Sequence, residues 1–213
     1  DIWLISPEGK VQKRITNGRE SKITYRICDY LYLSEKTQGS ADFVKRNFDL
    51  SKGIVLTANG QDKATGYFLW TDKNNLKEMV YGNVRFSRLK KANKADKFIF
   101  IEEDFQTPPL LNYIDNGRAK PTKLFQTNAH FKNYQWGTSK LISYKNNKGD
   151  DLQGALFYPV GYQPGKKYPM IVYIYSKLSQ NIHEYNNPTM YQPIGFPPSN
   201  YTIDGYLVLM PDI

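Results

Sequence analysis

The stretch Lys166-Lys-Tyr-Pro-Met-Ile-Val-Tyr-Ile-Tyr-Ser-Lys-Leu-Ser179 decides the fold, together with Asp204-Gly-Tyr-Leu-Val-Leu-Met-Pro-Asp-Ile213. Each is a short apolar run rich in Ile, Val, Leu and Tyr, and each is entered through a Pro or a Gly. Such runs are typical of strands that are buried on both faces of a parallel sheet. We expect strands over residues 170–175 and 205–210. The first should begin directly after Pro169, because proline can open a strand but cannot occupy its interior.

A hairpin is expected just before these runs. Residues 140–145 and 152–158 have strand composition, and the turn Asn146-Asn-Lys-Gly149 separates them. The segment that joins the two apolar runs, residues 176–204, is rich in Pro, Asn and Tyr. Connections of this length inside a compact unit are usually functional.

The first part of the chain carries a weak repeat of hairpins. The copies begin at Asp1, Gly66 and Leu111, and each has an aromatic strand, a tight Asp/Asn/Gly turn and a second strand. When Leu69 is aligned with Ile114, the last two copies lie about 45 residues apart, which is the length of one four-stranded propeller blade. The pattern therefore favours a β-propeller.

Further strands are expected between these hairpins, over residues 23–33, 54–57 and 98–102. The longer distance between the first two copies indicates an insertion near residues 36–40. We therefore predict a partial propeller of about two to three blades over residues 1–133. A free-standing β-sandwich has the same periodicity and stays open as an alternative.

The composition is that of a β-rich globular chain. Of its 213 residues 40% are hydrophobic and 17 are tyrosines, whose rings favour pleated surfaces, and the mean hydropathy is -0.61. No apolar run approaches the ~20 residues needed to cross a bilayer, so no membrane span is expected. No initiator Met or signal peptide is visible, and Asp1 opens directly onto a strand-like run, which favours a segment of a longer protein.

Metal and cofactor chemistry is not expected. Cys28 is the single cysteine, so an internal disulfide is excluded, and its alternating neighbours indicate a small buried thiol. One Cys and two His provide too few soft ligands for a structural zinc site.

The net charge of +9 raises the question of a nucleic-acid partner. The densest basic run is Arg88-Leu-Lys-Lys-Ala-Asn-Lys-Ala-Asp-Lys97, which we expect to be an exposed turn leading into a strand at Phe98. Lysine dominates the run, and it has no interleaved aromatic residues on which bases could stack. No nucleic-acid partner is therefore expected.

The second half of the chain resembles the prolyl oligopeptidase family, particularly its dipeptidyl peptidase IV-like branch. The matching residues are Trp136-Gly137, Gly154-Ala-Leu-Phe-Tyr-Pro159 and the two apolar runs that end at Tyr175 and Ile213. A less specific match to the end of the family's propeller is Phe98-Ile-Phe-Ile-Glu-Glu-Asp-Phe105 with Pro108-Pro109 after it.

This resemblance implies a mixed β and α/β fold. Partial β-propeller blades over residues 1–133 would be followed, over residues 134–213, by the N-terminal part of an α/β-hydrolase catalytic domain. In the family the nucleophile motif G-x-S-x-G comes later than the segment that matches Pro211-Asp-Ile213. The resemblance thus implies a piece that stops before its serine and is inactive by itself.

The implied parent is a serine exopeptidase or oligopeptidase that cleaves short peptides, with release of dipeptides from an N-terminus as one mode. A Ser-Asp-His triad would cut the peptide bond, and the propeller would restrict entry to short or unfolded peptides. Members of this branch are often exported, so a periplasmic or extracellular location is implied.

None of the three triad residues can be placed in this chain. Gly137-Thr-Ser-Lys-Leu141 lacks the second glycine of the nucleophile motif. His130 and His183 precede the position where the motif would follow, while the base comes after the nucleophile in this fold. Structural or surface roles are expected for both histidines.

By resemblance, Tyr175 is the one candidate catalytic residue. The dipeptidyl peptidase IV branch has a tyrosine at this place after the third strand, and its hydroxyl helps to hold the oxyanion of the tetrahedral intermediate. A tyrosine that merely packs at a strand end is the alternative. The branch also grips substrate amino termini with paired glutamates, but Glu102-Glu103 lacks the surrounding motif, and we expect a solvated strand end there.

Two other functions remain open from sequence. A non-catalytic β-rich module could bind peptides or glycans through surface Tyr and Trp residues, and an assembly protein could use its basic face against an acidic partner. The apolar runs after residue 168 favour the peptidase. An exposed sheet edge beyond Ile213 would also invite pairing with another chain, and hence an oligomer.

Overall fold

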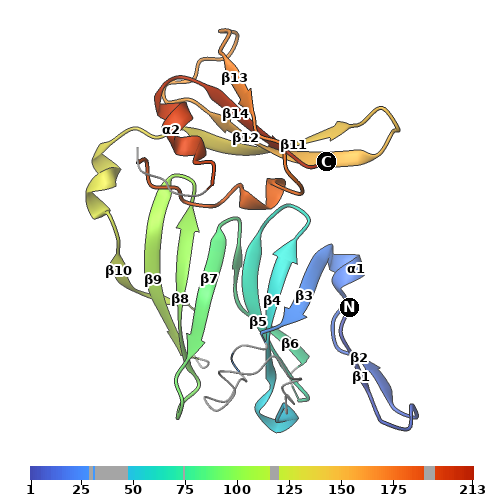
Figure 1. The fold of residues 1–213 in the computed structure, drawn as a ribbon. Helices are drawn as coiled ribbons and strands as arrows, with labels where there is room; N and C mark the ends of the chain where they lie inside the picture. The colour runs from blue at the N-terminus through green and yellow to red at the C-terminus, as the bar shows by residue number, and fades with distance from the viewer. Residues whose placement is uncertain (29–30, 32–47, 74, 116–119, 190–194) are drawn as a thin grey trace. The chain divides into compact units, whose positions relative to one another are not determined.

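The computed structural model describes residues 1–28, 31, 48–73, 75–115, 120–189 and 195–213. It is mostly β-structure with a few short helices, and its sheets are open within these residues (Figure 1). The chain divides into two compact units: residues 1–100 with 112–122, and residues 101–111 with 123–213. The insertion expected near residues 36–40 lies outside the described residues.

The first unit begins with the expected hairpin. β1 (Trp3–Ile5) pairs antiparallel with β2 (Gln12–Arg14), and the short helix α1 (Gly18–Ser21) follows. The Arg14 guanidinium donates to Asp1 at 2.8 Å and to Glu20 at 2.8 Å. The hydrogen bond from Arg14 lowers the pKa of Glu20 to about 2, so this ion pair persists into strong acid.

A four-stranded antiparallel sheet follows in the same unit. Its order is β3-β4-β5-β6, and the short helix η3 (Leu50–Lys52) precedes β4. The strands are β3 (Ile23–Ile27), β4 (Ile54–Gly60), β5 (Thr65–Thr71) and β6 (Asn75–Gly82). The hairpin predicted to start at Gly66 is confirmed, while the strand expected over residues 23–33 already ends at Ile27 within the described residues.

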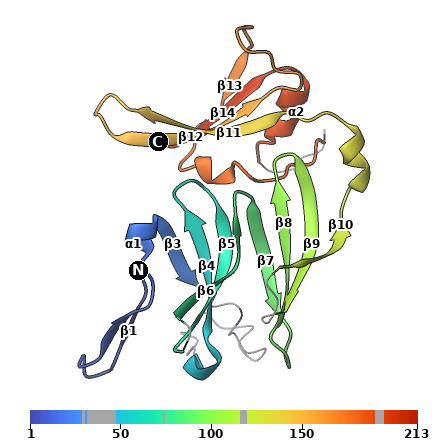
Figure 2. The same ribbon diagram turned by 180° about the vertical axis from the view of Figure 1, so that it is seen from behind.

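A second four-stranded sheet has the order β10-β9-β8-β7 and is seen most clearly from behind (Figure 2). Its strands are β7 (Arg85–Lys91), β8 (Lys97–Asp104), β9 (Thr107–Asp115) and β10 (Thr122–Gln126). This order of four consecutive strands is that of a β-meander, which is the pattern expected of a propeller blade.

The basic run of the sequence does not form a turn throughout, contrary to expectation. Residues 88–91 belong to β7, and the turn is confined to Ala92 through Asp96, where the Ala92 N–H donates to the Lys97 carbonyl at 2.8 Å. Leu89 is fully buried, whereas its neighbours Arg88 and Lys90 are exposed. Leu89 and Phe86, which also packs against this core, anchor the strand, and the surrounding charges hid it in the sequence.

The core of the first unit joins strands β4 to β9. Cys28, Leu69, Leu89, Phe98 and Phe100 are members of one buried cluster. Cys28 is 1% exposed, so the expectation of a small buried thiol is confirmed. The alternation of buried and exposed side chains along β8 and β9 follows from the period of two of a strand.

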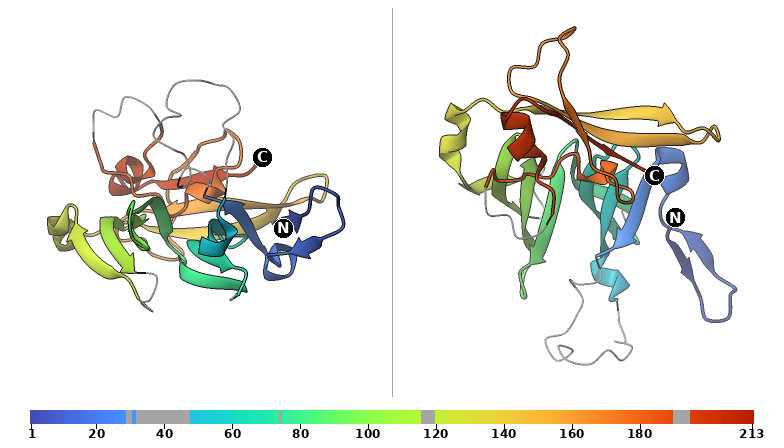
Figure 3. Two further views of the ribbon diagram at one scale, coloured as in Figure 1. Left: turned by 90° about the horizontal axis from the view of Figure 1, so that it is seen from below. Right: turned by 45° about the horizontal axis from the view of Figure 1, so that its top comes forward.

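The third four-stranded sheet, in the second unit, has the order β11-β12-β14-β13. β11 (Thr138–Lys145) and β12 (Asp151–Tyr158) form the predicted hairpin, which extends as a long ribbon in Figure 3 (right). β14 (Leu207–Pro211) pairs antiparallel with β12 and parallel with β13 (Met170–Val172). The parallel pairing expected from the two apolar runs is thus present.

β13 nevertheless differs from the expectation in length and burial. It ends at Val172 rather than at residue 175, and Met170 and Val172 are each 47% exposed. The reason is its position at the edge of the described sheet, where only β14 pairs with it and one of its faces is open. β14 lies inside the sheet, and its Val208 and Met210 are buried.

Short helices occupy the connection between β13 and β14, where the sequence predicted only a long loop. They are η5 (Ser179–Asn181) and α2 (Pro198–Ile203), while η4 (Ala129–Asn133) precedes β11. Pro198 starts α2, a position where the missing N–H costs nothing. Parallel neighbours need a crossover of a dozen or more residues, which explains the length of this connection. No helix in the described ranges is long and apolar enough to cross a membrane.

A substitution at Gly66 tests the close pairing of β5 with β6. A Cβ atom at Gly66 would lie 2.2 Å from the Val80 carbonyl oxygen, whereas one at Gly82 would meet nothing closer than 4.0 Å. We expect Gly66→Ala to lower the free energy of unfolding by about 1–3 kcal/mol, because backbone would have to move. The matched control Gly82→Ala should stay within about 0.5 kcal/mol of the parent chain in urea denaturation. Equal effects of the two changes would contradict this pairing.

Candidate functional site

Tyr175 lies in an exposed loop directly after the parallel edge strand β13. The strand's last regular contact is the Tyr173 N–H, which donates to the Leu209 carbonyl at 2.9 Å. The chain then turns outward, so that Ile174 is 58% and Tyr175 74% exposed. Among the described residues the Tyr175 hydroxyl has no hydrogen-bond partner. A phenol held in this way can donate a hydrogen bond to an external acceptor.

The loop returns to the sheet at Lys177. Lys177 forms an isolated antiparallel bridge with Asp212, just beyond β14. The next two residues, Leu178 and Ser179, are buried at 7% and 1% exposure. Tyr175 is therefore held between one backbone anchor at Tyr173 and a second at Lys177.

The Asp212 carboxylate binds Ser179 with both of its oxygens. Oδ1 accepts the Ser179 N–H at 2.9 Å, and Oδ2 accepts the Ser179 hydroxyl at 2.7 Å. The Asp212 backbone is fixed as well, because its N–H donates to the Gln153 carbonyl at 2.8 Å and its carbonyl accepts the Tyr144 hydroxyl at 2.6 Å. Burial raises the pKa of Tyr144, and the charge of Asp212 adds to this shift, so this donor stays protonated.

A stack of three aromatic rings supports the residue from which the loop departs. The rings of Tyr173 and Phe196 are parallel with centroids 4.6 Å apart, and Phe196 and Tyr201 stack at 4.8 Å. Tyr201 belongs to α2, so the helix holds the end of β13 from the side. Offset stacked pairs contribute about 0.5–1.5 kcal/mol beyond their area burial.

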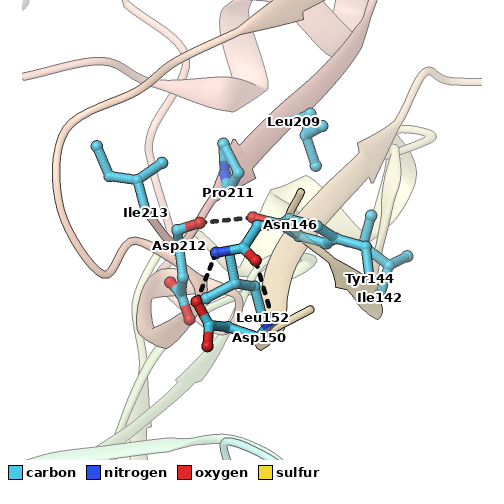
Figure 4. A pocket seen from close by; sticks show the side chains of 9 residues that line it. All are labelled: Ile142, Tyr144, Asn146, Asp150, Leu152, Leu209, Pro211, Asp212 and Ile213. Atoms are coloured by element: carbon cyan, nitrogen blue, oxygen red, sulfur yellow. Dashed lines mark hydrogen bonds between the residues drawn. The ribbon is translucent and has the colours of Figure 1, made fainter. Parts of the chain in front are cut away.

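The open face of the sheet near the chain's last residues carries a hollow of about 860 Å³ (Figure 4). Its lining is mostly apolar and includes Ile142, Leu152 and Leu209. Its two carboxylates are already engaged: Asp212 binds Ser179, and Asp150 accepts the Asn146 side-chain amide at 2.9 Å. Tyr175 does not line this hollow. Because both carboxylates are engaged, the hollow offers no evident catalytic group.

One of the two histidines is buried and the other lies on the surface. His183 is 6% exposed, and its Nδ1 lies 2.9 Å from Asp104 Oδ1. His130 lies on the surface in η4 and contacts the Phe131 ring at a centroid distance of 4.5 Å.

The expectation that Glu102-Glu103 is a solvated strand end is wrong. β8 continues to Asp104, Glu103 is 9% exposed, and Glu102 is half-buried. The tip of the β8–β9 hairpin belongs to the second unit, where Phe105 packs on Phe157 at a centroid distance of 4.7 Å. The carboxylate that the sequence placed in solvent is therefore buried in a strand that continues beyond it.

The Trp136-Gly137 pair has a structural explanation. A Cβ atom at Gly137 would lie 2.2 Å from the Tyr158 carbonyl oxygen, so only glycine fits where β11 begins beside β12. The Trp136 indole N–H donates to the Phe131 carbonyl at 3.2 Å. Residues 138–141 continue as regular strand, which explains why Ser139 does not sit in a nucleophile turn.

Sequence reasoning missed the Ser179–Asp212 and His183–Asp104 pairs. The signal for Asp212 was present, because polar groups that follow parallel strands gather at one edge of a sheet. Nothing in the sequence pointed to Ser179 as its partner, since the pairing depends on how the long connection folds back.

No protein-family model and no curated protein sequence matches this chain. Solved structures do match its fold, and all of those described below are peptidases. The Porphyromonas gingivalis dipeptidyl peptidase 4 has a TM-score of 0.63 and 16% identity over 99% of this chain. A putative dipeptidyl aminopeptidase IV from Bacteroides ovatus has a TM-score of 0.56 and 19% identity over 96%. The AtxE2 isopeptidase has a TM-score of 0.56 and 12% identity over 99%.

The chain spans only part of each of these structures: 27% of the Porphyromonas enzyme, 26% of the Bacteroides protein and 36% of the isopeptidase. Identities this low show a shared fold and nothing finer. The fold of this chain is thus similar to a portion of larger peptidases.

Phe105 tests whether the tip of the β8–β9 hairpin is part of the second unit's core. Phe105 is 1% exposed, whereas Phe125 in β10 is 64% exposed. We expect Phe105→Ala to destabilise the second unit by about 3–5 kcal/mol, because it leaves a cavity beside Phe157. Phe125→Ala, the matched control, should change stability by less than about 0.5 kcal/mol. Thermal unfolding, monitored by amide exchange in β12, measures the change in stability of both variants. A Phe105→Ala variant as stable as the parent chain would contradict the packing.

Proposed function

We propose that this chain is a segment of a serine peptidase of the prolyl oligopeptidase type, similar to dipeptidyl peptidase IV. In this proposal residues 1–133 are the last two to three blades of a propeller, and residues 134–213 begin an α/β-hydrolase catalytic domain. Its support is the likeness in fold to larger peptidases, which covers nearly the whole chain. The substrate class is short peptides.

The observation that carries the proposal is the position of Tyr175. It follows the parallel pair β13 and β14, and in open sheets of this class ligands bind outside the carboxyl ends of the parallel strands. Its side chain is 74% exposed, so its hydroxyl can reach a substrate carbonyl. The edge of β13 that has no partner strand among the described residues is where further parallel strands would pair and bring a nucleophile to the same end of the sheet.

The role assigned to each residue follows from this placement. The Tyr175 hydroxyl donates to the oxyanion that forms when the nucleophile adds to the substrate carbonyl. Such a donor acts mainly in the transition state, because the negative charge exists only there. We assign the nucleophile, acid and base of the triad to other parts of the parent protein.

Tyr175→Phe in the full-length protein tests the assignment. The substitution keeps the ring and removes only the hydroxyl donor. We expect kcat to fall about 10²–10³-fold with KM little changed, the cost of deleting one oxyanion donor. Hydrolysis of chromogenic dipeptide and tripeptide substrates measures both constants.

Tyr134→Phe is the matched control, because Tyr134 is also exposed, at 64%. It should leave kcat unchanged. If Tyr175→Phe keeps turnover within about twofold of the parent, Tyr175 is not an oxyanion donor and its role is structural.

A further inference from the structure

The loop that carries Tyr175 has no regular secondary structure, yet its two ends are fixed. On one side the Tyr173 N–H binds the Leu209 carbonyl, and on the other Lys177 bridges Asp212. Both partners belong to β14 or to the residue directly after it. The loop is thus held at one end by β14 and at the other end by Asp212, the residue directly after β14.

The second anchor is a backbone bridge that stands alone, and a single bridge opens easily. What reinforces it is the pair of hydrogen bonds from Ser179 to the Asp212 carboxylate, at 2.9 Å from the N–H and 2.7 Å from the hydroxyl. Ser179 is 1% and Asp212 8% exposed, so water competes little for these bonds. Hydrogen bonds to a charged acceptor are roughly twice as strong as neutral ones.

Asp212 is itself rigid. Its N–H and its carbonyl are bound to Gln153 of β12 and to the Tyr144 hydroxyl of β11. The carboxylate therefore holds Ser179, and with it the chain that follows Tyr175, at a fixed position relative to the sheet. Buried, fully bonded carboxylates of this kind fix one conformation rather than add much net stability.

We propose that Ser179 and Asp212 are positioning residues that fix the loop of residues 174–177 and thereby aim the Tyr175 hydroxyl. The inference rests on the proposed oxyanion role of Tyr175, but its structural half, the restraint of the loop, stands apart from that role. Neither residue touches the substrate. Their effect on turnover passes through Tyr175.

The test uses two variants of the full-length protein. Ser179→Ala removes the hydroxyl donor and keeps the N–H bond. Asp212→Asn preserves both contacts, because the amide oxygen accepts the Ser179 N–H and the amide nitrogen donates to the Ser179 hydroxyl. Ser143→Ala is the matched control, since Ser143 lies exposed on β11.

Hydrogen exchange measures the restraint directly. In Ser179→Ala the amides of residues 174–179 should exchange about tenfold faster than in the parent, while the β11–β12 hairpin keeps its protection. Ser143→Ala should leave both segments unchanged, and Asp212→Asn, which keeps both contacts but loses the charge of the acceptor, should speed exchange of residues 174–179 by less than Ser179→Ala does. Unchanged exchange of residues 174–179 in Ser179→Ala would overturn the inference, whatever the activity.

Turnover measures the consequence for Tyr175. Ser179→Ala should lower kcat about tenfold or more with KM nearly constant, because misplacing a catalytic group costs transition-state binding. Asp212→Asn, which keeps both contacts to Ser179, should retain most of the parent's kcat. In a Tyr175→Phe background the same Ser179→Ala change should have no further effect, since coupled residues are not additive.

The possible results separate the two claims. If Ser179→Ala lowers kcat by the same factor with and without the Tyr175 hydroxyl, Ser179 does not act through Tyr175 and the inference fails. If Tyr175→Phe alone has no effect on kcat, the proposed oxyanion role fails, and the exchange data still decide whether Ser179 and Asp212 hold the loop.

Discussion

The parallel pairing of β13 with β14 determines the arrangement of the second unit. β14 follows β13 in the chain but lies between β12 and β13 in the sheet. After β13 the chain must therefore cross over and return as β14 between these two strands. That crossover places η5 and α2 beside the sheet and brings the residue after β14 next to the loop after β13. Every feature near Tyr175 depends on this one topological step.

The same step makes β13 a short strand at the edge of the described sheet. It has one partner, its apolar side chains are half exposed, and it gives way to a loop after Val172. A loop at this position presents Tyr175 outward, while Asp212 and Ser179 tie its far end to the interior. Exposure of the phenol and restraint of its backbone are the two properties that an oxyanion donor needs.

Much of this fold could be predicted from the sequence, and the reasons for the failures are physical. The hairpin of β11 and β12 has a clear turn between two strand-like runs. The strands β13 and β14 were predicted from their continuous runs of Ile, Val and Leu. β7 was missed because, within the basic run of residues 88–91, Leu89 is the one buried apolar side chain among basic neighbours. α2 was missed because a helix of this length has too few residues to display a period.

The candidate site could be predicted only in part. Tyr175 was predicted from the resemblance of the chain to a family, and the structure places it shortly after the parallel strand β13. Ser179, Asp212 and the burial of Glu103 depend on contacts between segments far apart in the chain, which no local pattern encodes. The role of Tyr175 remains a proposal that rests on placement and on the shared fold.

The most direct measurement is to map the serine that a fluorophosphonate probe labels in the full-length protein. The account predicts a single labelled serine, inside a G-x-S-x-G motif located after Ile213, and no labelling within residues 1–213. The 213-residue chain by itself should remain unlabelled. A labelled serine within residues 1–213, or a full-length protein that has no such motif and takes up no probe, would contradict the claim that this chain is a segment of a serine peptidase.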